Sequence, residues 1–586
     1  SSMATLIVFL PLSFMSGVTG AFSKALAVTM AAALIISYLF AALIVPILAR
    51  RFIDFKRWHD PAEGREGWLA RHHSRLLERV FRKPIILAAA VVPLLLIGWL
   101  AYSRVPSGFM PQVDEGGFVM DFYTLPGTSL DETERELHQI EAILREQPEV
   151  QTFSRRTGTG LGGDLGEPHH GDFFVRLKAD HERGTEDVMA AVLADIERTV
   201  PGVQIELAQL SEDLIGDLTA VPQPIEIKLY ATNPAALIPQ ARKVAAAIAK
   251  IDGIVEIKDG VTLAGDGIDL KIDPVKAAFE STTPDDISKA IDIALNGAIA
   301  TQLAQANKLV DVRVRIPDAF KLTTEGLADL PIRATDGHLF PLSRVASLTP
   351  VSGEPEISRD NLEPMVAVTA RIENRGIGAA VADVQKLLAQ PGMLVPGVRY
   401  EFGGLYKQQQ IAFAGLALVF LAALIAELVL LLVLYEDFWL PLIIVGTSLL
   451  STTAVFTELW VTGVELNITA LMGMTMVIGM ATEMAIFYVS EYTELAHTLP
   501  LRQALFEASR NRLRPITMTT LAAILTLMPL ALALGQGSGM QQPLAIAIIA
   551  GLLIQYPLVL LAMPVLIGLI QERKAQAAAP ALPALG

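Results

Sequence analysis

Cysteine is absent from this 586-residue chain, and charged side chains are scarce. Without a thiol the chain can form no disulfide, zinc-thiolate site or iron–sulfur cluster. Asp, Glu, Lys and Arg together make up 18% of the residues, whereas about 25% is usual in a soluble domain. Hydrophobic residues make up 52%. This balance is typical of a membrane protein.

Several functional patterns are also missing. The chain has no Gly-x-x-x-x-Gly-Lys string to bind the phosphates of ATP, and the glycine-rich run 158–166, which lacks the lysine, is predicted to be a flexible loop. No nucleophile–base pair points to catalysis, so we expect no enzyme activity, no cofactor and no nucleic-acid partner. No basic segment precedes the first apolar run, as it would in a secretory signal. Because the chain begins Ser1-Ser2-Met3, we expect a truncated protein or a split-gene subunit.

Eight apolar runs approach the ~20 residues that a helix needs to span a bilayer. They cover about 4–20, 24–49, 84–102, 411–435, 440–462, 467–490, 515–534 and 541–571. Residues 103–410, between the third and fourth runs, contain 46 acidic and 29 basic side chains, a net charge of −17. The rest of the chain has 15 acidic and 17 basic side chains, a net charge of +2. An acidic soluble block is therefore inserted between two apolar blocks.

Basic residues gather at one set of helix ends. Segment 50–83 carries ten of them, segment 491–514 carries four, and Arg573 and Lys574 follow the last run. All lie on one side if the eight helices alternate, and the positive-inside rule makes that side cytoplasmic. The block 103–410 then faces outward. Within the basic segment, residues 66–83 are predicted to form either an amphipathic helix on the inner membrane surface or a packed connector helix.

The outer block has the pattern of two similar modules. Over residues 118–207, strand-like and helical runs follow in the order βαββαβ, the split βαβ motif. The order begins again at 224–257 and is completed at 365–402. The interruption, about 263–356, is predicted to be a separate inserted module with its own short strands.

This arrangement resembles the second half of a permease of the RND (resistance–nodulation–division) superfamily along essentially the whole chain. Short strings in the family's order and spacing carry the resemblance: Phe14-Met15-Ser16-Gly17 with Thr19-Gly20, Gly108-Phe109-Met110-Pro111 with Asp114-Glu115-Gly116, Leu434-Tyr435-Glu436 with Trp439, Arg512-Leu513-Arg514-Pro515 with Met518-Thr519, and Gly535-Gln536-Gly537-Ser538-Gly539.

The resemblance implies a multi-pass α-helical protein of the bacterial inner membrane with a large α/β insertion in the periplasm, of α+β, ferredoxin-like type. The implied parts are two transmembrane helices (1–49, family helices 5 and 6), a basic cytoplasmic segment (50–83), transmembrane helix 7 (84–102), a first porter-like subdomain (103–217), a second one (218–262 and 357–404), a docking-like insertion (263–356), five transmembrane helices (405–571, family helices 8 to 12) and a cytoplasmic tail (572–586).

The implied function is proton-driven efflux of toxic compounds, either heavy-metal cations or amphiphilic drugs, toward an outer-membrane channel. The implied partners are the missing amino-terminal half of the permease, a periplasmic adaptor, the outer-membrane channel and two further copies in a homotrimer, together with protons, membrane lipid and the substrate. The alternative is a non-pumping relative, either a protein-export auxiliary or a receptor-like sensor. The two large outer modules favour the pump, because export auxiliaries carry smaller ones.

Glu483 is the first candidate site residue. It lies in the run 467–490, about eight residues from the cytoplasmic end and hence roughly 12 Å deep at 1.5 Å per residue. A carboxylate at that depth is costly to ionise, so gain and loss of a proton can change how neighbouring helices pack. Gly479, one turn earlier, would let a neighbouring helix approach. The alternative is a glutamate satisfied by a hydroxyl or water without proton transport.

The resemblance places Arg512 and Thr519 with Glu483 at three proton-relay positions of the family. Arg512 and Thr519 are seven residues apart and therefore share a helix face. The family's other essential acids belong to a helix that this chain lacks, so we expect an incomplete relay. Glu427 is a possible second intramembrane acid without a family counterpart. Glu458, near an outer helix end, is expected to reach water.

Substrate-pathway candidates are weaker. Met472, Met476, Met480 and Met484 recur every four residues, which suits either a soft metal ion or adaptable packing. Copper-exporting relatives carry three porter methionines, and the matching positions here are Asp121 with Met120 beside it, His170 and Gly216. His169 and His170 near Asp172 could bind a divalent ion, or form a solvated loop pair. No metal site is assigned, and divalent metals and organic compounds both remain open as substrates.

Overall fold

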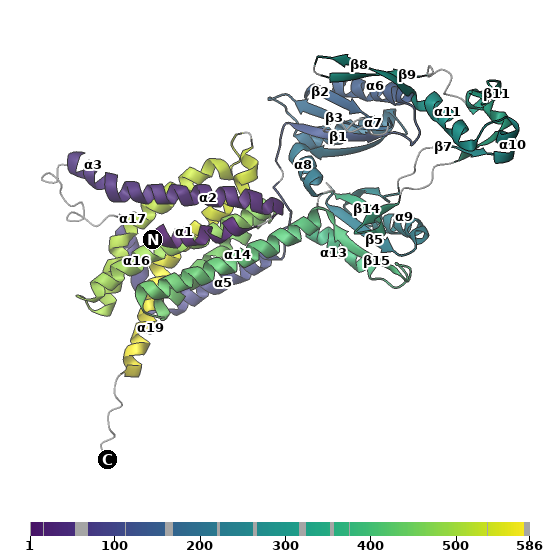
Figure 1. Ribbon diagram of the computed structural model, residues 1–586. Helices are drawn as coiled ribbons and strands as arrows, with labels where there is room; N and C mark the ends of the chain where they lie inside the picture. The colour runs from purple at the N-terminus through teal and green to yellow at the C-terminus, as the bar shows by residue number, and fades with distance from the viewer. Residues whose placement is uncertain are drawn as a thin grey trace.

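The computed structural model describes residues 2–15, 17–52, 68–111, 113–158, 168–219, 223–261, 267–306, 308–315, 324–351, 357–373, 375–535 and 537–578. The helices and the strands separate in space. Figure 1 shows one bundle of long helices and, at the far end of α14, a second mass that contains all the labelled strands. This separation follows the charge partition of the sequence, because the acidic block forms the strand-rich part.

The bundle is built from helices that are almost wholly apolar. Seven helical segments in the described part of the chain are long and apolar enough to cross a membrane. The elements are α1 (Ser2–Phe9), η1 (Pro11–Phe14), α2 (Gly17–Leu39), η2 (Phe40–Ile44), α3 (Val45–Phe52), α4 (Trp68–Arg82), α5 (Ile85–Tyr102), α14 (Gly404–Tyr435), α15 (Trp439–Thr462), α16 (Ile468–Ala496), α17 (Leu501–Ala531), η7 (Ser538–Gln541), α18 (Gln542–Pro557), η8 (Leu558–Ala562) and α19 (Met563–Ala578).

The prediction of eight spans is wrong for the first apolar run. Residues 4–20 do not form one helix, because α1 ends at Phe9 and a short 3-10 turn starts at Pro11. Leu10 still has helical dihedral angles, but Pro11 lacks the N–H that would continue the hydrogen bonding of the helix. The other runs lie in long helices, and α17 starts earlier than expected, at Leu501, and passes through Pro515.

The basic segment before α5 contains α4, which is amphipathic. Its buried residues His73, Leu77 and Val80 lie on one face, and α4 contacts α17 and η8. The His73 Nε2 atom lies 3.2 Å from the carbonyl oxygen of Leu560. The structure therefore shows contact between this helix and the bundle, while Trp68, Leu69 and Leu76 stay exposed. The location of the helix relative to the membrane surface stays a prediction.

The first outer module has the predicted βαββαβ order. Its elements are β1 (Gly117–Tyr123), α6 (Leu130–Glu146), β2 (Val150–Thr157), β3 (His170–Leu177), α7 (Thr185–Thr199) and β4 (Gln204–Gln209), followed by α8 (Leu210–Thr219). The strands form one antiparallel sheet in the order β2-β3-β1-β4. One face of the sheet packs against α6 and α7 through a core that includes Phe118, Met120 and Phe122.

The second outer module repeats this topology around an insertion, as predicted. Its elements are β5 (Ile225–Ala231), η4 (Pro234–Ala236), α9 (Leu237–Ile248), β6 (Ile254–Lys258), β13 (Ser358–Asp360), β14 (Glu363–Ile372), α13 (Ile377–Leu388) and β15 (Val398–Gly403). The strand order is β13-β14-β5-β15, and β6 pairs with β14. The porter-like and docking-like roles of these modules stay predictions.

The insertion leaves and returns on neighbouring strands, because β7 pairs with β12. This pairing lets a separate module with its own core interrupt the second module without disturbing its sheet. The elements are β7 (Gly267–Ile272), α10 (Pro274–Phe279), α11 (Pro284–Asn296), β8 (Ala298–Gln305), β9 (Lys308–Val314), α12 (Thr324–Ala328), β10 (Pro331–Arg333), β11 (Leu339–Pro341), η6 (Leu342–Arg344) and β12 (Ala346–Val351).

The helix α16 lies at the centre of the bundle, in contact with α1, α14, α15, α17 and α18. Its crossing with α18 is close because glycines lie at the contact. A Cβ atom on Gly551 would lie 2.4 Å from Cγ1 of Val477, and one on Gly473 would lie 2.8 Å from the carbonyl oxygen of Leu544. Small residues at such crossings let helix backbones approach within a membrane.

We expect Gly551→Ala to lower the thermal unfolding midpoint of the chain in detergent, because the stiff Val477 side chain cannot move away from the new methyl group. Overpacking of this kind costs about 1–3 kcal/mol. Gly446→Ala in α15 is the matched control, since a Cβ atom there meets no atom within 4 Å. Circular dichroism during heating measures both variants. Equal midpoints for the two would contradict the proposed tight crossing.

Candidate functional sites in the membrane and the periplasm

Glu483 lies on α16 at the contact with α1. The Thr5 hydroxyl donates a hydrogen bond of 3.1 Å to Glu483 Oε2. Gly479 permits this approach, as predicted, because a Cβ atom there would lie 3.3 Å from Val8 Cγ2 and 3.6 Å from the Thr5 Cα atom. The Glu483 side chain is half-buried, and among the described residues no basic group pairs with it. A hydroxyl, rather than a cation, therefore satisfies this carboxyl group.

Arg512 forms an ion pair that the sequence did not predict. Its Nη2 atom lies 2.8 Å from Oε2 of Glu491 on α16, and Asn511 Nδ2 donates to the other oxygen of Glu491 at 2.8 Å. Glu491 is two helical turns from Glu483 toward the inner end of α16. The sequence did contain a signal for this ion pair. The helices α16 and α17 are joined by a short loop and are therefore antiparallel neighbours, which brings residues near the loop on the two helices close together.

Thr519 points away from the other two predicted relay residues. Its side chain is exposed, and its hydroxyl donates within its own helix to Pro515 O at 3.2 Å and Ile516 O at 3.0 Å. The neighbouring Thr520 faces inward and contacts Met484 Sδ at 3.8 Å, so Thr519 is level with Glu483. In the described part of the chain no hydrogen bond or ion pair joins any two of Glu483, Arg512 and Thr519.

The methionine stripe of α16 is packing in this structure. Met472, Met476 and Met484 belong to the main hydrophobic core of the bundle, with Met480 packed against it. Most of their neighbours are apolar, and the hydroxyls of Ser23 and Thr520 donate to Met472 Sδ at 3.6 Å and Met484 Sδ at 3.8 Å. These surroundings fit the adaptable-packing interpretation. Glu427 on α14 is different, because it is fully buried and neither carboxyl oxygen has a hydrogen-bond partner.

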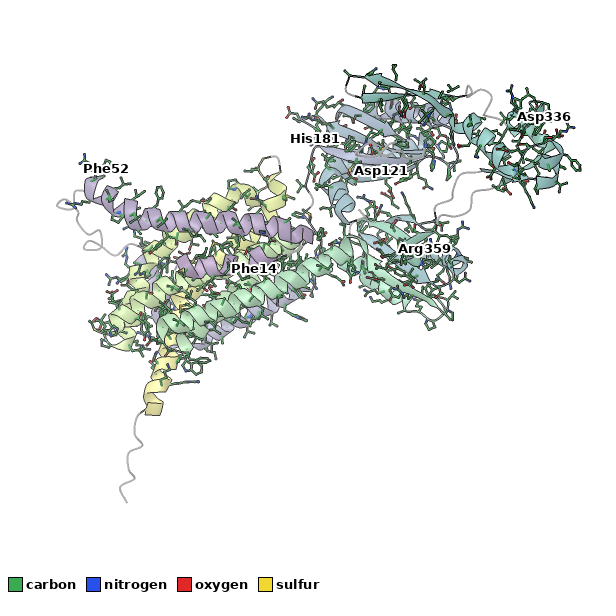
Figure 2. The ribbon with its side chains drawn as sticks, in the orientation of Figure 1. Phe14, Phe52, Asp121, His181, Asp336 and Arg359 are labelled. Atoms are coloured by element: carbon green, nitrogen blue, oxygen red, sulfur yellow. The ribbon has the colours of Figure 1, made fainter. Side chains whose placement is uncertain are left out.

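Three acidic side chains lie opposite one another across the first outer sheet. Asp121 on β1 is in register with Asp172 on β3 and with Glu206 on β4. Residues opposite one another in antiparallel strands project from the same face. This face is the one not covered by α6 and α7, and Figure 2 labels Asp121 there, toward the second module.

The basic residues near these acids leave Asp121 unpaired. Arg156 binds Asp172 through Nε and Oδ1 at 2.8 Å, and Lys258 of the second module binds Glu206. Burial, and then the negative charges of Asp213, Glu206 and Asp172, raise the pKa of Asp121 to about 7. Asp121 therefore changes charge near neutral pH, whereas its neighbours are held by cations.

The remaining pathway candidates occupy different places. Met120 is fully buried in the core between the sheet and its helices, on the face opposite Asp121, because side chains alternate along a strand. Its thioether therefore does not reach the periplasmic surface in this structure. His170 stacks on Tyr123 with ring centroids 4.7 Å apart, and burial lowers the pKa of His170. Asp172, the proposed third ligand beside His169 and His170, is engaged by Arg156.

A preformed metal cluster is absent from the part of the chain that the structure describes, where no three His, Asp or Glu side chains lie close enough together to hold an ion. The acids around Asp121 are the nearest approach to an oxygen ligand set, and carboxylate oxygens are ligands for divalent cations such as zinc.

The AcrB/AcrD/AcrF family is matched over residues 1–571. The chain belongs to this family of RND permeases. It is 28% identical to the cobalt-zinc-cadmium resistance protein CzcA of Cupriavidus metallidurans over 96% of the chain and 54% of that protein, and 26% identical to the nickel and cobalt resistance protein CnrA of the same species over 97% and 54%. The RND permease chain therefore spans about half the length of these curated relatives.

A solved heavy metal efflux pump shares the fold. Its crystal form II matches this RND permease chain with a TM-score of 0.82 at 23% identity, over 98% of the chain and 58% of the pump. The family and the seven apolar helices confirm a multi-pass inner-membrane protein with a large periplasmic part. The predicted resemblance and fold class are thus confirmed, whereas the site residues stay predictions.

We expect Asp121→Asn to stabilise the RND permease chain more at pH 8 than at pH 5. The pKa of about 7 exceeds the ordinary value of 3.8, so the folded chain keeps a proton that the unfolded chain has lost. The free energy of unfolding therefore falls as the pH rises through this window, and asparagine removes the loss. Thermal unfolding of the variant and the unmodified chain at both pH values measures this difference in stability. Asp131→Asn, at an exposed position of α6, is the control. Equal shifts at both pH values would contradict the assignment.

Proposed function

We propose that this chain is part of a proton-driven RND efflux pump that exports divalent heavy-metal cations. The observation that carries the proposal is the unpaired Asp121 carboxyl group beside Asp172 and Glu206, because carboxylate oxygens suit divalent cations, whereas monovalent copper or silver would favour thioethers. The names of two relatives, a cobalt-zinc-cadmium and a nickel-cobalt resistance protein, point to the same class of substrate.

Binding of a divalent cation at Asp121 would displace its proton. The charges of Asp213, Glu206 and Asp172 raise the cost of ionising Asp121, and a cation among these groups reverses that effect. Lys258 lies beside this set, since its Nζ atom binds Glu206 and lies 5.2 Å from the Tyr123 ring. Because Lys258 belongs to the second module, movement between the modules would alter the charge balance at Asp121.

Glu483 would carry the proton through the membrane part. It has a hydroxyl partner, Thr5, and no cation, so both protonation states can be accommodated as α1 and α16 adjust. Arg512 and Thr519 would act with it through residues of the complete permease, since the structure does not bring the three together. The mechanism proposed is thus exchange of protons for metal, without covalent catalysis.

The complete pump would need partners. We propose the other half of the permease, a homotrimer, a periplasmic adaptor and an outer-membrane channel. The span Ser23–Phe52 supports this in part, because the apolar residues Ile36, Phe40 and Leu43 on it are more than half exposed. A helix of this composition needs lipid or further helices around it.

Zinc efflux tests the substrate proposal. The chain is co-expressed with the other half of the permease in a zinc-sensitive host, and we expect Asp121→Asn to lower zinc efflux about tenfold, corresponding to about 1.4 kcal/mol. Asp131→Asn removes the same charge from the exposed surface of the same module and serves as the control. Normal zinc efflux by Asp121→Asn, with the protein present at normal amounts, would refute the role of the carboxylate set.

Proton flux tests the relay separately. In vesicles containing both halves, we expect Glu483→Gln to abolish metal-dependent proton movement, because glutamine cannot exchange a proton. Glu458→Gln, near the outer end of α15, is the matched control. If Glu483→Gln transports metal with unchanged rate and unchanged pH dependence, Glu483 is not part of the relay. If both variants lack transport, the result favours the non-pumping alternative.

A further inference from the structure

Glu427 is a buried acid that the proposed relay does not use. It lies near the inner end of α14 and is fully inaccessible to solvent. Neither of its carboxyl oxygens has a hydrogen-bond partner among the described residues. An ionised carboxylate without a cation or a donor is strongly disfavoured in an apolar interior, so the resting form of Glu427 is the neutral acid.

The group that faces Glu427 is the hydroxyl of Thr482 on α16, at a geometry too poor for a hydrogen bond. Thr482 is also fully buried, and its Oγ1 atom lies 3.1 Å from Oγ of Ser448 on α15. Ser448 can in turn donate to the carbonyl oxygen of Ile444 at 3.0 Å. An acid and two hydroxyls on three helices therefore form a row that ends on a backbone acceptor.

Gln555 on α18 contacts α16 at Ala481, the residue before Thr482. Its Nε2 atom donates to the carbonyl oxygen of Ala481 at 3.2 Å, while its own Oε1 is buried without a partner. Three unpartnered buried acceptor atoms, two on Glu427 and one on Gln555, thus flank residues 481–482 of α16. Buried polar atoms of this kind usually have a partner, which indicates a site for exchangeable hydrogen.

In the part of the chain that the structure describes, no fixed cation compensates Glu427. Of the helices packed against α14 in the bundle, the described part of α1 carries no titratable side chain, and α15 carries only Glu458 near its outer end. On α16 the nearest titratable group is Glu483, which is turned toward Thr5 of α1. Tyr435 on α14 itself donates to α16 at Ile486 O, two turns further inward. Protonation is therefore the available way to neutralise this carboxyl group.

We propose that Glu427, Thr482 and Ser448 form a second intramembrane proton-binding site, separate from Glu483. In the protonated form the Glu427 O–H points to Thr482, Thr482 donates to Ser448, and Ser448 donates to Ile444 O. On release the O–H bond of the acid breaks and its proton leaves on a water molecule. Thr482 then turns to donate to the carboxylate, and Ser448 turns to donate to Thr482.

This site would connect a proton to the outer modules through one rigid element. The helix α14 runs without interruption from Gly404 to Tyr435, and Gly404 follows β15 directly. Its N–H donates to Glu226 Oε2 on β5 at 3.0 Å. A change in how Glu427 contacts α16 is therefore applied to a helix that begins at the sheet of the second module.

Infrared spectroscopy of the chain in nanodiscs tests the proposal without any transport assay, so its outcome is independent of the proposed pump. We expect a carboxylic-acid carbonyl band that persists at about pH 7, where solvated carboxylic acids are ionised, and disappears at higher pH. Subtracting the spectrum of Glu427→Gln isolates the band, since Asp121 and the other acids contribute to both spectra. Thr482→Val should shift the band without abolishing it.

Glu458→Gln and Glu483→Gln are the matched controls and should leave the isolated band unchanged. The proposal is overturned if the Glu427→Gln spectrum retains the full band, or if the band stays constant up to the highest pH at which the chain is folded. Loss of the band in Glu483→Gln would show that the band belongs to Glu483 and would also overturn the proposal. Should Glu427→Gln fail to fold, an unshifted band in Thr482→Val decides against the hydroxyl row.

Discussion

The junction at residues 106–109 connects the bundle to both outer modules. Gly108 N donates to Leu466 O at 3.1 Å and Leu466 N donates to Pro106 O at 2.9 Å, so the chain after α5 is pinned to the loop before α16. Ser107 O accepts from Ile377 N of the second module at 3.0 Å, and Gln409 on α14 donates to Gly108 O at 3.1 Å. These backbone contacts hold the chain between α5 and β1 against α14, the loop before α16 and the second module. They add to the direct link of α14 with β5 and β15.

The charge and hydropathy pattern was sufficient to predict most of the fold. Long apolar runs have one stable form in lipid, the helix, because every backbone polar group must be satisfied within the segment. The split second module was also predictable, because the runs before and after the insertion kept their strand-like and helical patterns. The first run was counted as a span on its hydropathy, although it is short and carries Pro11, which ends the helical hydrogen bonding. The face on which Met120 lies follows from strand alternation, because Phe118, Met120 and Phe122 form the buried set.

The site residues were less predictable, because side-chain direction depends on tertiary contacts. Arg512 and Thr519 do share one helix, yet Thr519 is exposed and Arg512 pairs with Glu491. Nothing in the sequence distinguishes Thr519 from Thr520, which faces inward. For Glu427 the sequence indicated only an acid in an apolar run. Among the described residues no cation or hydrogen-bond donor meets it, and Thr482 faces it from α16 with Ser448 of α15 next in the row. This arrangement depends on how α14, α15 and α16 pack.

Asp121 and Glu427 are governed by the same physical rule in different surroundings. In each case neighbouring polar groups are already paired elsewhere: Arg156 with Asp172 and Lys258 with Glu206 around Asp121, and Ser448 with Thr482 beside Glu427. A buried acid left without a cation keeps its proton, and it gives that proton up when a positive charge or a donor arrives. In the periplasm the arriving charge can be a divalent cation, whereas in the bundle only a rotated hydroxyl or a moved helix can supply the change. In the functions proposed above, Asp121 responds to a cation and Glu427 responds to a movement of α14.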